Sequence, residues 1–493
     1  MVKIIPTPKI VDVNEDVLCK IKCAIFTEKE EWMPFCERFA KDFALMNNGV
    51  KPALEKGSIS IVQNLAIRPD GYRLVCDTDK LEVIVSTEEG LCYAVSSLLH
   101  YLSVNDDDYV CRNYKSDSFE YFKASIEDYP DKGYRAMMID LAREWHPFKT
   151  LFKYVDVCFM YKIKYLHLHF VDAQSYTFPS KAFPKLSVEG KHYTHEQLEE
   201  LKAYAKLRGV ILVPEFECPG HAYTLVETYP EIFGNVYDED LSDKNESEQG
   251  DPLPPNFILC AGSEKCFEGT KVLIKEMCDM FPDSPYINIG GDEACIKMWN
   301  ECSCCRKYME DNGISDVYEL YSEYVGKIAS YVLSIGKTPL VYEGFPRRGV
   351  SKIPKETIVL AWEYYYNIAP DLIEDGFRIV NATSTPLYTV NSQDYHFRPN
   401  EILDWNVYKF DNQWTESKSY GGVEIEPTQQ LLGAMICSWQ QTYEQEINYI
   451  MENSAIISER IWNTTPHCSN EELMDKFTNI TSVTKLPRLI QDR

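Results

Sequence analysis

Two adjacent carboxylates follow a glycine pair in the run GGDEA, and their types and spacing suit acid–base chemistry. Asp292 and Glu293 come directly after Gly290 and Gly291. Neighbouring side chains on a regular strand point to opposite faces, but glycine lets the backbone leave the pleat, so that both carboxylates could face one pocket. Like charges held close together raise one pKa, which keeps one carboxylic acid protonated and able to donate a proton. The dipeptide alone fits a tight turn with a helix-capping aspartate equally well.

A repeating pattern of short apolar runs predicts the elements that position this pair. Longer segments with helical spacing separate the runs, as in a parallel sheet covered by helices. Eight such units favour a (β/α)8 TIM barrel over an open sheet, and no GxGxxG motif follows the first run to support a dinucleotide-binding fold. The runs are 134–140, 165–172, 210–216, 286–293, 338–344, 357–364, 378–384 and 431–439.

Acidic residues are concentrated at the ends of these predicted strands. The active site of such a barrel lies at the C-terminal ends of its strands. Any single acidic residue there is more often a helix N-cap, but so many at one rim indicate a catalytic site. The strand-end residues are Asp140, Asp172, Glu215, Glu217, Asp292, Glu293, Glu343, Glu363 and Trp439.

The chain divides into two predicted domains. Residues 1–125 are expected to form a small α/β domain, and residues 126–493 the catalytic barrel. The polar stretch 112–133 is interpreted as the connection between them. In the first domain, the expected elements are strands at 59–62 and 81–85 and a helix from Gly90. In the barrel, a capping box at Thr194 and a glycine at Gly209 delimit one helix, and 315–335 predicts another.

Composition narrows the class of protein further. The formal charge is -26 and the pI is about 4.8. An acidic surface repels phosphate backbones and anionic lipids, so neither a nucleic acid nor a membrane is expected as a partner. Neither a signal peptide nor a membrane-spanning apolar run is visible. The 17 cysteines, an odd number in a long chain, predict free thiols in a reducing cytoplasm. The oligomeric state stays open.

Four motifs, in order along the chain, resemble those of glycoside hydrolase family 20, the β-N-acetylhexosaminidases. They fall on the first four predicted barrel strands, and residues 1–125 are similar to the domain that precedes the barrel in this family. The motifs are RAMMIDLAR with Arg135, Asp140 and Arg143; HLHFVDAQS with His167, His169, Asp172 and Gln174; PEFECPGH with Glu215 and His221; and NIGGDEACIKMW with Asp292, Glu293 and Trp299.

The resemblance implies a retaining reaction in which the 2-acetamido group of the substrate is the nucleophile. By resemblance, Glu293 is the general acid and base, and Asp292 holds the acetamido N–H. His221 and Glu215 lie behind this pair and tune it, and His169 is expected in a supporting position. The implied substrate-binding residues are Arg135, Tyr388, Trp362, Trp439, Gln441, Asp172 and Tyr342. The expected partner is a glycan with a terminal N-acetylhexosamine, and no cofactor is expected.

Several positions depart from the family pattern. Ala173 replaces the second aspartate of the Asp-Asp-Gln motif, and Tyr342 stands where a pocket tryptophan is frequent. Gln441 and Val390 replace acidic residues that contact the outer hydroxyls of the sugar in the family. A pocket without those acceptors discriminates less against a changed hydroxyl, which predicts that GalNAc, a substituted sugar or a longer glycan terminus is accepted.

Three alternatives have weaker support. The cluster of Cys295, Cys302, Cys304 and Cys305 invites a zinc site, but it lacks a second CxxC pair, and we expect free thiols that pack the loop. A metal-dependent amidohydrolase would carry its His-x-His on the first strand, whereas His167 falls on the second. A non-catalytic sugar-binding barrel is disfavoured because Asp292, Glu293 and Tyr388 are all present.

Overall fold

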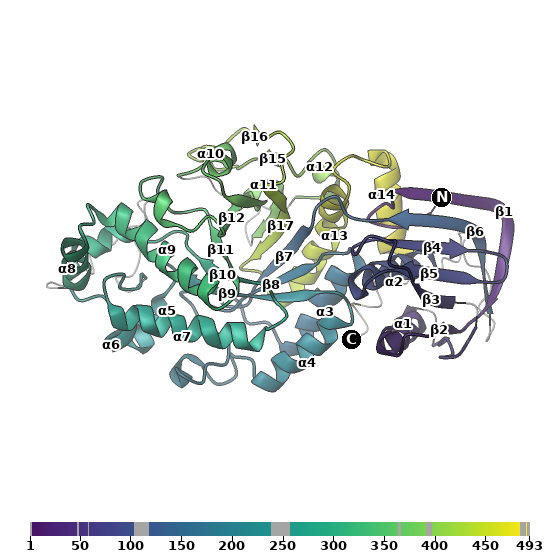
Figure 1. Cartoon of the computed structure of the whole chain (residues 1–493), viewed down its shortest axis with the longest axis horizontal. Coiled ribbons are helices and arrows are strands. Elements are labelled where there is room, and N and C mark those ends of the chain that lie inside the picture. Colours follow the sequence, from purple (N-terminus) through teal and green to yellow (C-terminus); the bar gives the residue numbers. More distant parts are fainter. Residues whose placement is uncertain are drawn as a thin grey trace.

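The protein was analysed as a computed structural model. It describes residues 2–46, 49–57, 59–102, 118–237, 257–362, 366–390, 397–483 and 490. A small sheet domain lies at one end of the molecule, and a barrel covered by helices makes up the rest (Figure 1).

The N-terminal domain is a six-stranded mixed sheet with two helices. The strand order is β1-β6-β4-β5-β3-β2. The helices are α1 (Met33–Met46) and α2 (Glu88–Tyr101), and Thr87 caps α2 by accepting a hydrogen bond from the Gly90 backbone N–H. The strands are β1 (Ile10–Lys22), β2 (Ile25–Thr27), β3 (Ile59–Gln63), β4 (Tyr72–Cys76), β5 (Leu81–Val85) and β6 (Ser118–Asp128).

Strand β6 corrects the interpretation of residues 112–133 as a connection. It pairs antiparallel with both β1 and β4, so it lies inside the sheet. The predicted domain boundary at residue 125 falls within this strand, and the first barrel strand begins at Tyr134.

The second domain is the predicted (β/α)8 barrel. Its eight parallel strands follow in sequence order, and the last strand pairs with the first, which closes the barrel. Every predicted run contains a strand. The barrel strands are β7 (Tyr134–Asp140), β8 (Tyr165–His169), β9 (Ile211–Cys218), β10 (Tyr286–Gly290), β11 (Thr338–Tyr342), β12 (Ile358–Ala361), β13 (Arg378–Asn381) and β17 (Leu431–Trp439).

Helices of different lengths cover the barrel. The predicted capping box is present at Thr194, where α4 begins, and Asp316 caps α9. The helices of four or more residues are α3 (Phe148–Met160), α4 (His195–Lys206), α5 (Tyr223–Thr228), α6 (Pro230–Phe233), α7 (Glu264–Met280), α8 (Ser303–Asn312), α9 (Val317–Ser334), α10 (Ala369–Glu374), α11 (Ser384–Leu387), α12 (Pro399–Ile402), α13 (Tyr443–Trp462) and α14 (Asn470–Thr478), with η3 (Ile296–Asn300) and η6 (Asn479–Val483). The short elements are η1 (Glu30–Trp32), η2 (Pro184–Leu186), η4 (Val350–Lys352), β14 (Tyr388–Val390), β15 (Lys409–Phe410) and β16 (Val423–Glu424).

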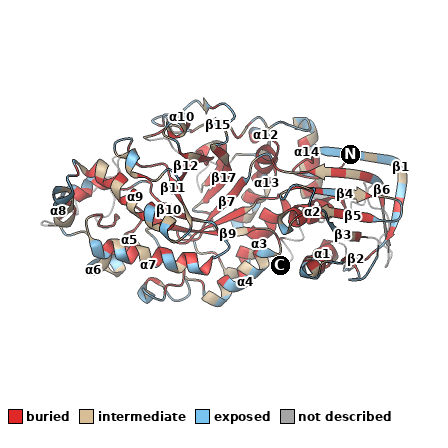
Figure 2. Cartoon of the chain, viewed as in Figure 1, coloured by how far each residue is buried: buried red, intermediate tan, exposed pale blue. Residues whose placement is uncertain are grey.

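Buried residues form two layers around the barrel strands. One cluster fills the barrel interior and includes Met138, Val213, Leu360 and Met435. The other lies between the strands and the surrounding helices and continues into the N-terminal domain. Figure 2 shows buried residues along the strands and alternating buried and exposed residues on α4 and α7.

Polar residues with little exposure join the two domains. Asp128 at the end of β6 accepts hydrogen bonds from Lys162 Nζ (2.9 Å) and from Trp462 Nε1 (2.8 Å). Arg135, near the start of β7, donates to Tyr93 on α2. The N-terminal sheet thus attaches near the N-terminal ends of the barrel strands, and the loops that follow β9 and β10 lie at the other end of the molecule (Figure 1). Among the described residues, no helix combines the length and apolarity needed to cross a bilayer.

Candidate active site

The glycine pair turns the chain sharply at the end of β10. Gly290 and Gly291 have φ values of 69° and 97°, and Glu293 has a φ of 44°. Positive φ is accessible to glycine at little cost, so the predicted departure from the strand pleat is confirmed. The Asp292 side chain is 11% exposed and that of Glu293 is 42% exposed. Glu293 is thus the carboxylate that solvent or a ligand reaches.

His221 connects this pair to a second carboxylate. Its Nε2 lies 3.2 Å from Glu293 Oε2 and 3.9 Å from Asp292 Oδ2. Its Nδ1 lies 3.2 Å from Asp172 Oδ1. Arg143 binds the other oxygen of Asp172 at 2.7 Å. Asp172 and His221 therefore orient Glu293 from behind, as a base is oriented by a neighbouring carboxylate.

The two adjacent carboxylates have pKa values that move in opposite directions. Burial raises the pKa of Asp292 to about 6, although the charge of His221 opposes this shift. Burial also raises the pKa of Glu293, but the hydrogen bond and the charge of His221 outweigh it, and the net shift is downward. Burial lowers the pKa of His221, yet Asp172 and Glu293 bring it well above its ordinary value. The proton affinity of His221 is therefore raised and that of its hydrogen-bond partner Glu293 is lowered.

A second buried network lies around Glu215 on β9. Its oxygens lie 3.0 Å from His167 Nδ1 and 3.0 Å from His169 Nδ1, and Tyr342 donates to it at 2.8 Å. The remaining ring nitrogens lie 2.7 Å from the Tyr134 hydroxyl and 3.0 Å from Asp172. All four ring nitrogens of this His-x-His motif thus have hydrogen-bond partners within the protein.

Glu217 is one of the predicted strand-end acids, but the family resemblance assigned it no role. It is buried on β9, and neither of its carboxyl oxygens has a hydrogen-bond partner within the described structure. A Cβ added at Gly290 would lie 1.9 Å from Glu217 Oε2, so the glycine makes room for this carboxyl. Burial, followed by the charge of Asp292, raises the pKa of Glu217 well above its ordinary value. Glu217 is therefore neutral next to Asp292.

Aromatic side chains form one wall of the site. Trp362 and Tyr388 stack with their ring centroids 6.2 Å apart and their planes 6° apart. Trp439 lies 6.2 Å from Tyr388, and Arg143 lies 5.0 Å above the Trp439 ring. The Tyr342 ring lies 6.0 Å from that of Trp439. Rings of this kind offer apolar faces to a sugar and exclude water from the reacting carbon.

The prediction that Arg135 binds substrate does not agree with its position in the structure. It is fully buried near the start of β7 and donates to the Lys162 and Lys132 carbonyls and to the Tyr93 hydroxyl. This end of the barrel is opposite to the strand ends that carry Asp292. Arg143, eight residues later in the same motif, is the arginine that lies beside the carboxylates and Trp439.

Other predicted residues have partners that define their positions. Both oxygens of Asp172 accept hydrogen bonds from the protein, so its carboxylate supports His221 instead of facing a ligand. Gln441 is buried; its Nε2 donates to the Trp439 carbonyl, and its Oε1 has no donor among the described residues. Glu343 accepts hydrogen bonds from Asn367 and is structural. Glu363 lies outside the described residues.

The predicted cysteine cluster gains a member from another loop. Cys260 follows β9 by 42 residues, and its Sγ lies 3.7 Å from that of Cys302 and 3.8 Å from that of Cys305. No disulfide joins the cysteines that the structure describes. The sequence carried no signal for Cys260, because no spacing motif connects it to the other three.

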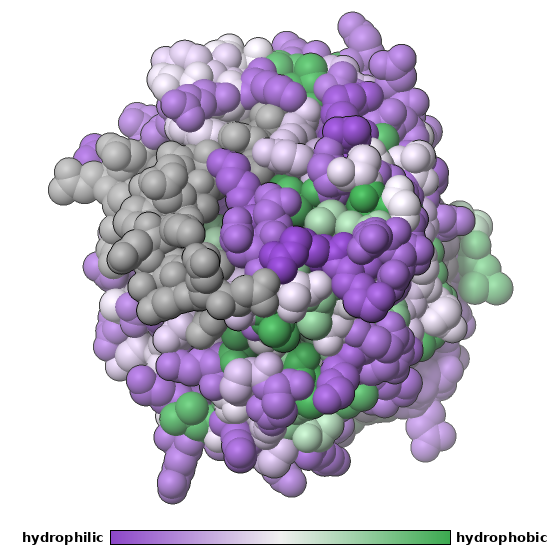
Figure 3. Space-filling model, turned by 90° about the vertical axis from the view of Figure 1, so that its left-hand side faces the viewer, coloured by the Kyte–Doolittle hydropathy of each residue, from purple (hydrophilic) through white to green (hydrophobic). Residues whose placement is uncertain are grey.

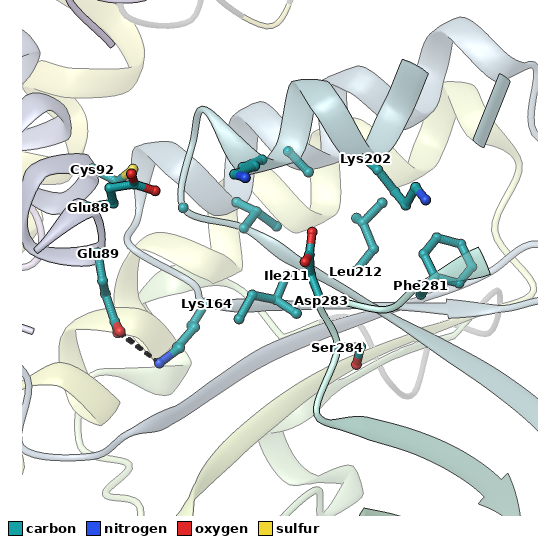
Figure 4. A pocket seen from close by; sticks show the side chains of 14 residues that line it. Glu88, Glu89, Cys92, Lys164, Lys202, Ile211, Leu212, Phe281, Asp283 and Ser284 are labelled. Carbon is teal, nitrogen blue, oxygen red and sulfur yellow. Dashed lines mark hydrogen bonds and ion pairs between the residues drawn. The ribbon is translucent and has the colours of Figure 1, made fainter. Parts of the chain in front are cut away.

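The surface supplies two further observations. A cavity of about 240 Å³ lies between α2 and α4 and is lined by Glu89, Lys164 and Ile211, at the N-terminal ends of β8 and β9 (Figure 4). It is thus at the opposite end of the barrel from Asp292 and Glu293.

Figure 3 views the end of the molecule where α8 lies; hydrophilic side chains dominate the described surface, and apolar ones form small separate patches.

Family models cover both domains of the chain. Residues 133–465 match the glycosyl hydrolase family 20 catalytic domain, and residues 1–129 match domain 2 of the same family. The chain therefore belongs to glycosyl hydrolase family 20. The confirmed barrel and the N-terminal domain agree with this membership.

Similar proteins carry hexosaminidase names. A β-hexosaminidase of Porphyromonas gingivalis is 26% identical over 385 residues, which are 73% of this chain and 47% of that protein. A β-hexosaminidase subunit beta of Entamoeba histolytica is 24% identical over 423 residues, 82% of this chain and 70% of that protein. The chain thus spans about half the length of the Porphyromonas relative.

Solved structures share the fold. The family 20 exo-β-N-acetylglucosaminidase of Vibrio harveyi, in complex with N-acetylglucosamine, has a TM-score of 0.82 and 18% identity, covering 100% of this chain and 78% of that one. The β-N-acetylhexosaminidase of Bacteroides fragilis has a TM-score of 0.76 and 21% identity, covering 97% and 94%. At these identities the likeness concerns the fold of both domains.

Proposed function

We propose that this protein hydrolyses terminal β-linked N-acetylhexosamine from glycans. The observation that carries the proposal is the pairing of a half-exposed Glu293, hydrogen-bonded to His221 at 3.2 Å, with the buried Asp292 next to an aromatic wall. A proton donor and a separate stabilising carboxylate at one strand end are what substrate-assisted hydrolysis requires. The family and the hexosaminidase names of its relatives support the same reaction.

In the first step, the acetamido oxygen of the substrate attacks C1 and the glycosidic C1–O bond breaks. Glu293 gives its proton to the leaving oxygen, and His221, whose Nε2 lies 3.2 Å from Glu293 Oε2, orients the carboxyl group. The product is an oxazolinium ion, and the ionised Asp292 stabilises its N–H and positive charge. Water then attacks C1 and passes a proton to Glu293, while the C1–O bond of the oxazolinium ring breaks and the acetamido group is restored. Two inversions at C1 retain the β configuration.

The direct test uses aryl β-N-acetylhexosaminides with the intact protein. We expect release of the aryl alcohol and inhibition by a thiazoline analogue of the oxazolinium ion. Asp292→Asn is expected to lose most of the activity without rescue by azide, because no nucleophile of the protein has been removed. Absence of hydrolysis on every N-acetylhexosaminide, or azide rescue of Asp292→Asn, would contradict the proposed reaction.

A finer proposal concerns the outer hydroxyls of the sugar. Gln441 and Val390 stand at positions where acidic acceptors would hold those hydroxyls, and a neutral amide discriminates less between epimers. We therefore expect GlcNAc and GalNAc aryl glycosides, or a C6-substituted sugar, to react at comparable rates. Hydrolysis of the GlcNAc glycoside alone would contradict this selectivity and leave the general reaction intact.

A further inference from the structure

Three buried thiols outside the active site lie at distances typical of a common metal ligand sphere. Cys260 Sγ lies 3.7 Å from Cys302 Sγ and 3.8 Å from Cys305 Sγ, and the three sulfur atoms lie within 4.8 Å of one another. Thiolates bound tetrahedrally to zinc at 2.3 Å are about 3.8 Å apart. The separations are much longer than a disulfide bond.

Backbone N–H groups lie close to the Cys302 sulfur atom. Cys302 is the residue before α8, and Cys304 and Cys305 lie in its first turn, where the helix N-terminus stabilises negative charge. The Val236 backbone N–H donates to Cys302 Sγ at 3.4 Å. The Cys304 thiol hydrogen-bonds to Cys260 and Cys302 and therefore lies beside the same group.

The backbone brings the cysteine-bearing loops into close contact. A Cβ added at Gly262 would lie 2.5 Å from the Cys304 carbonyl oxygen, so only glycine fits there. Trp299 donates to the Leu259 carbonyl at 2.9 Å, and the Ser303 backbone N–H donates to the Val236 carbonyl at 2.9 Å. Three segments, after β9, before α7 and before α8, thus meet at the sulfur atoms.

We propose that Cys260, Cys302 and Cys305, with Cys304 as the fourth ligand, bind a structural zinc ion. The ion connects the loop after β9, which carries His221, to the loop after β10, which carries Glu293. The segment before Cys260 also contacts the active site directly, because the ring of Phe257 lies 5.1 Å from that of His221. The ion fixes the separation between His221 and Glu293 without taking part in the reaction.

Elemental analysis of the whole protein tests this site. After expression in zinc-supplemented medium and purification with a non-chelating reductant, we expect about one zinc per chain. Cys260→Ser and Cys302→Ser are expected to lose at least about four fifths of this zinc. Cys468→Ser is the matched control, because Cys468 contacts Thr7 far from the cluster, and it should retain the zinc of the wild type.

A second measurement does not depend on variants that fold. The wild-type protein is stripped of metal with a chelator and titrated with Co²⁺. We expect one equivalent to give the charge-transfer and d–d bands of a tetrahedral cobalt thiolate, and zinc to abolish them. Zinc below about a tenth of an equivalent together with absent cobalt bands would overturn the proposal, as would a Cys260–Cys302 disulfide in protein kept under reductant.

Discussion

At the scale of single residues, the site separates two adjacent carboxylates by their surroundings. Asp292 is buried and has a pKa raised to about 6, whereas Glu293 is half-exposed and has a pKa lowered by His221. Environments that push pKa values apart are how one fold assigns different roles to identical groups. His221, whose pKa lies well above its ordinary value, is the more basic member of the hydrogen-bonded pair that it forms with Glu293.

Replacement of Glu293 tests the assignment of the general acid. Glu293→Gln is expected to lower turnover about 10²–10⁴-fold on substrates with poor leaving groups, because these need protonation. An aryl glycoside with an acidic phenol needs little protonation and is expected to lose much less. Steady-state rates on a natural disaccharide and on a nitrophenyl glycoside measure the difference. Equal losses on both would reject Glu293 as the acid.

The pKa of Asp292 predicts a pH dependence. Asp292 must be ionised to stabilise the developing positive charge, and burial places its pKa at about 6. We therefore expect kcat/KM on an aryl glycoside to rise with pH through about 6, the acid limb of the profile of the free enzyme. Glu217→Gln should leave this limb in place, because Glu217 is already neutral. A profile that is flat from pH 5 to 7 would contradict the prediction.

Part of the site was predictable from residues alone, and the failures have physical reasons. The motifs identified Asp292, Glu293 and His221, whose proximity the structure bears out. The motif predicts Arg135 as a substrate-binding residue, although the direction of the strand distinguishes it from Arg143. Only Arg143 lies at the C-terminal end of β7. Cys260 had no such signal, because the contact depends on how two loops fold together.

At the scale of elements, the eight barrel strands were predictable because strands buried on both faces read as continuous apolar runs. Strand β6 was missed because one of its faces is partly solvated. Tyr121, Ala124 and Ile126 are buried, but the residues between them are polar or more exposed, and this alternation resembles a linker in composition. The sequence did not predict the short helices and strands between β13 and β17, because most of them have only two to four residues.

Helix α13 carries a buried acid that predicts a stability effect. Glu446 lies in its first turn, and burial raises its pKa to about 8 although a hydrogen bond with Ser438 opposes the shift. The folded protein binds this proton more tightly than the unfolded chain, so the contribution to stability is present at low pH. It is lost as pH rises from the ordinary glutamate range through about 8.

Glu446→Gln removes this dependence. The melting temperature of the variant relative to the wild type is therefore expected to increase from pH 5 to pH 8.5, by several degrees. Glu444→Gln is the matched control, because Glu444 is exposed in the same turn and its replacement should leave that difference nearly constant. A wild-type protein that gains stability relative to Glu446→Gln over this range would contradict the assigned pKa.

At the scale of the whole molecule, Arg135 joins the two domains instead of holding sugar. Its guanidinium satisfies buried carbonyls of the barrel and the Tyr93 hydroxyl of α2. Arg135→Ala is expected to lower the free energy of unfolding by about 3 kcal/mol, since it leaves buried acceptors without donors. The kcat/KM of the folded fraction should change less than about threefold.

Arg143→Lys is the counterpart of this variant. Arg143 lies beside Asp172 and Trp439, so its replacement should lower kcat/KM by at least about tenfold and change the melting temperature less than Arg135→Ala does. Denaturant unfolding and initial rates of both variants provide the comparison. Loss of substrate affinity in Arg135→Ala with unchanged stability would instead support Arg135 as a substrate-binding residue.

The closure of the barrel has a consequence for how the chain is synthesised. Strand β7 pairs with β17, whose partners Tyr134 and Gly433 are about 300 residues apart. Until β17 leaves the ribosome, the nascent barrel has two open strand edges, at β7 and at β13, whose backbone groups can pair with other chains. The N-terminal sheet is complete once β6 has been made, long before this happens. The growing chain therefore passes through a long interval with one finished domain and an unclosed, aggregation-prone second one. Chaperones that cover the open strand edges during this interval would raise the yield of folded protein.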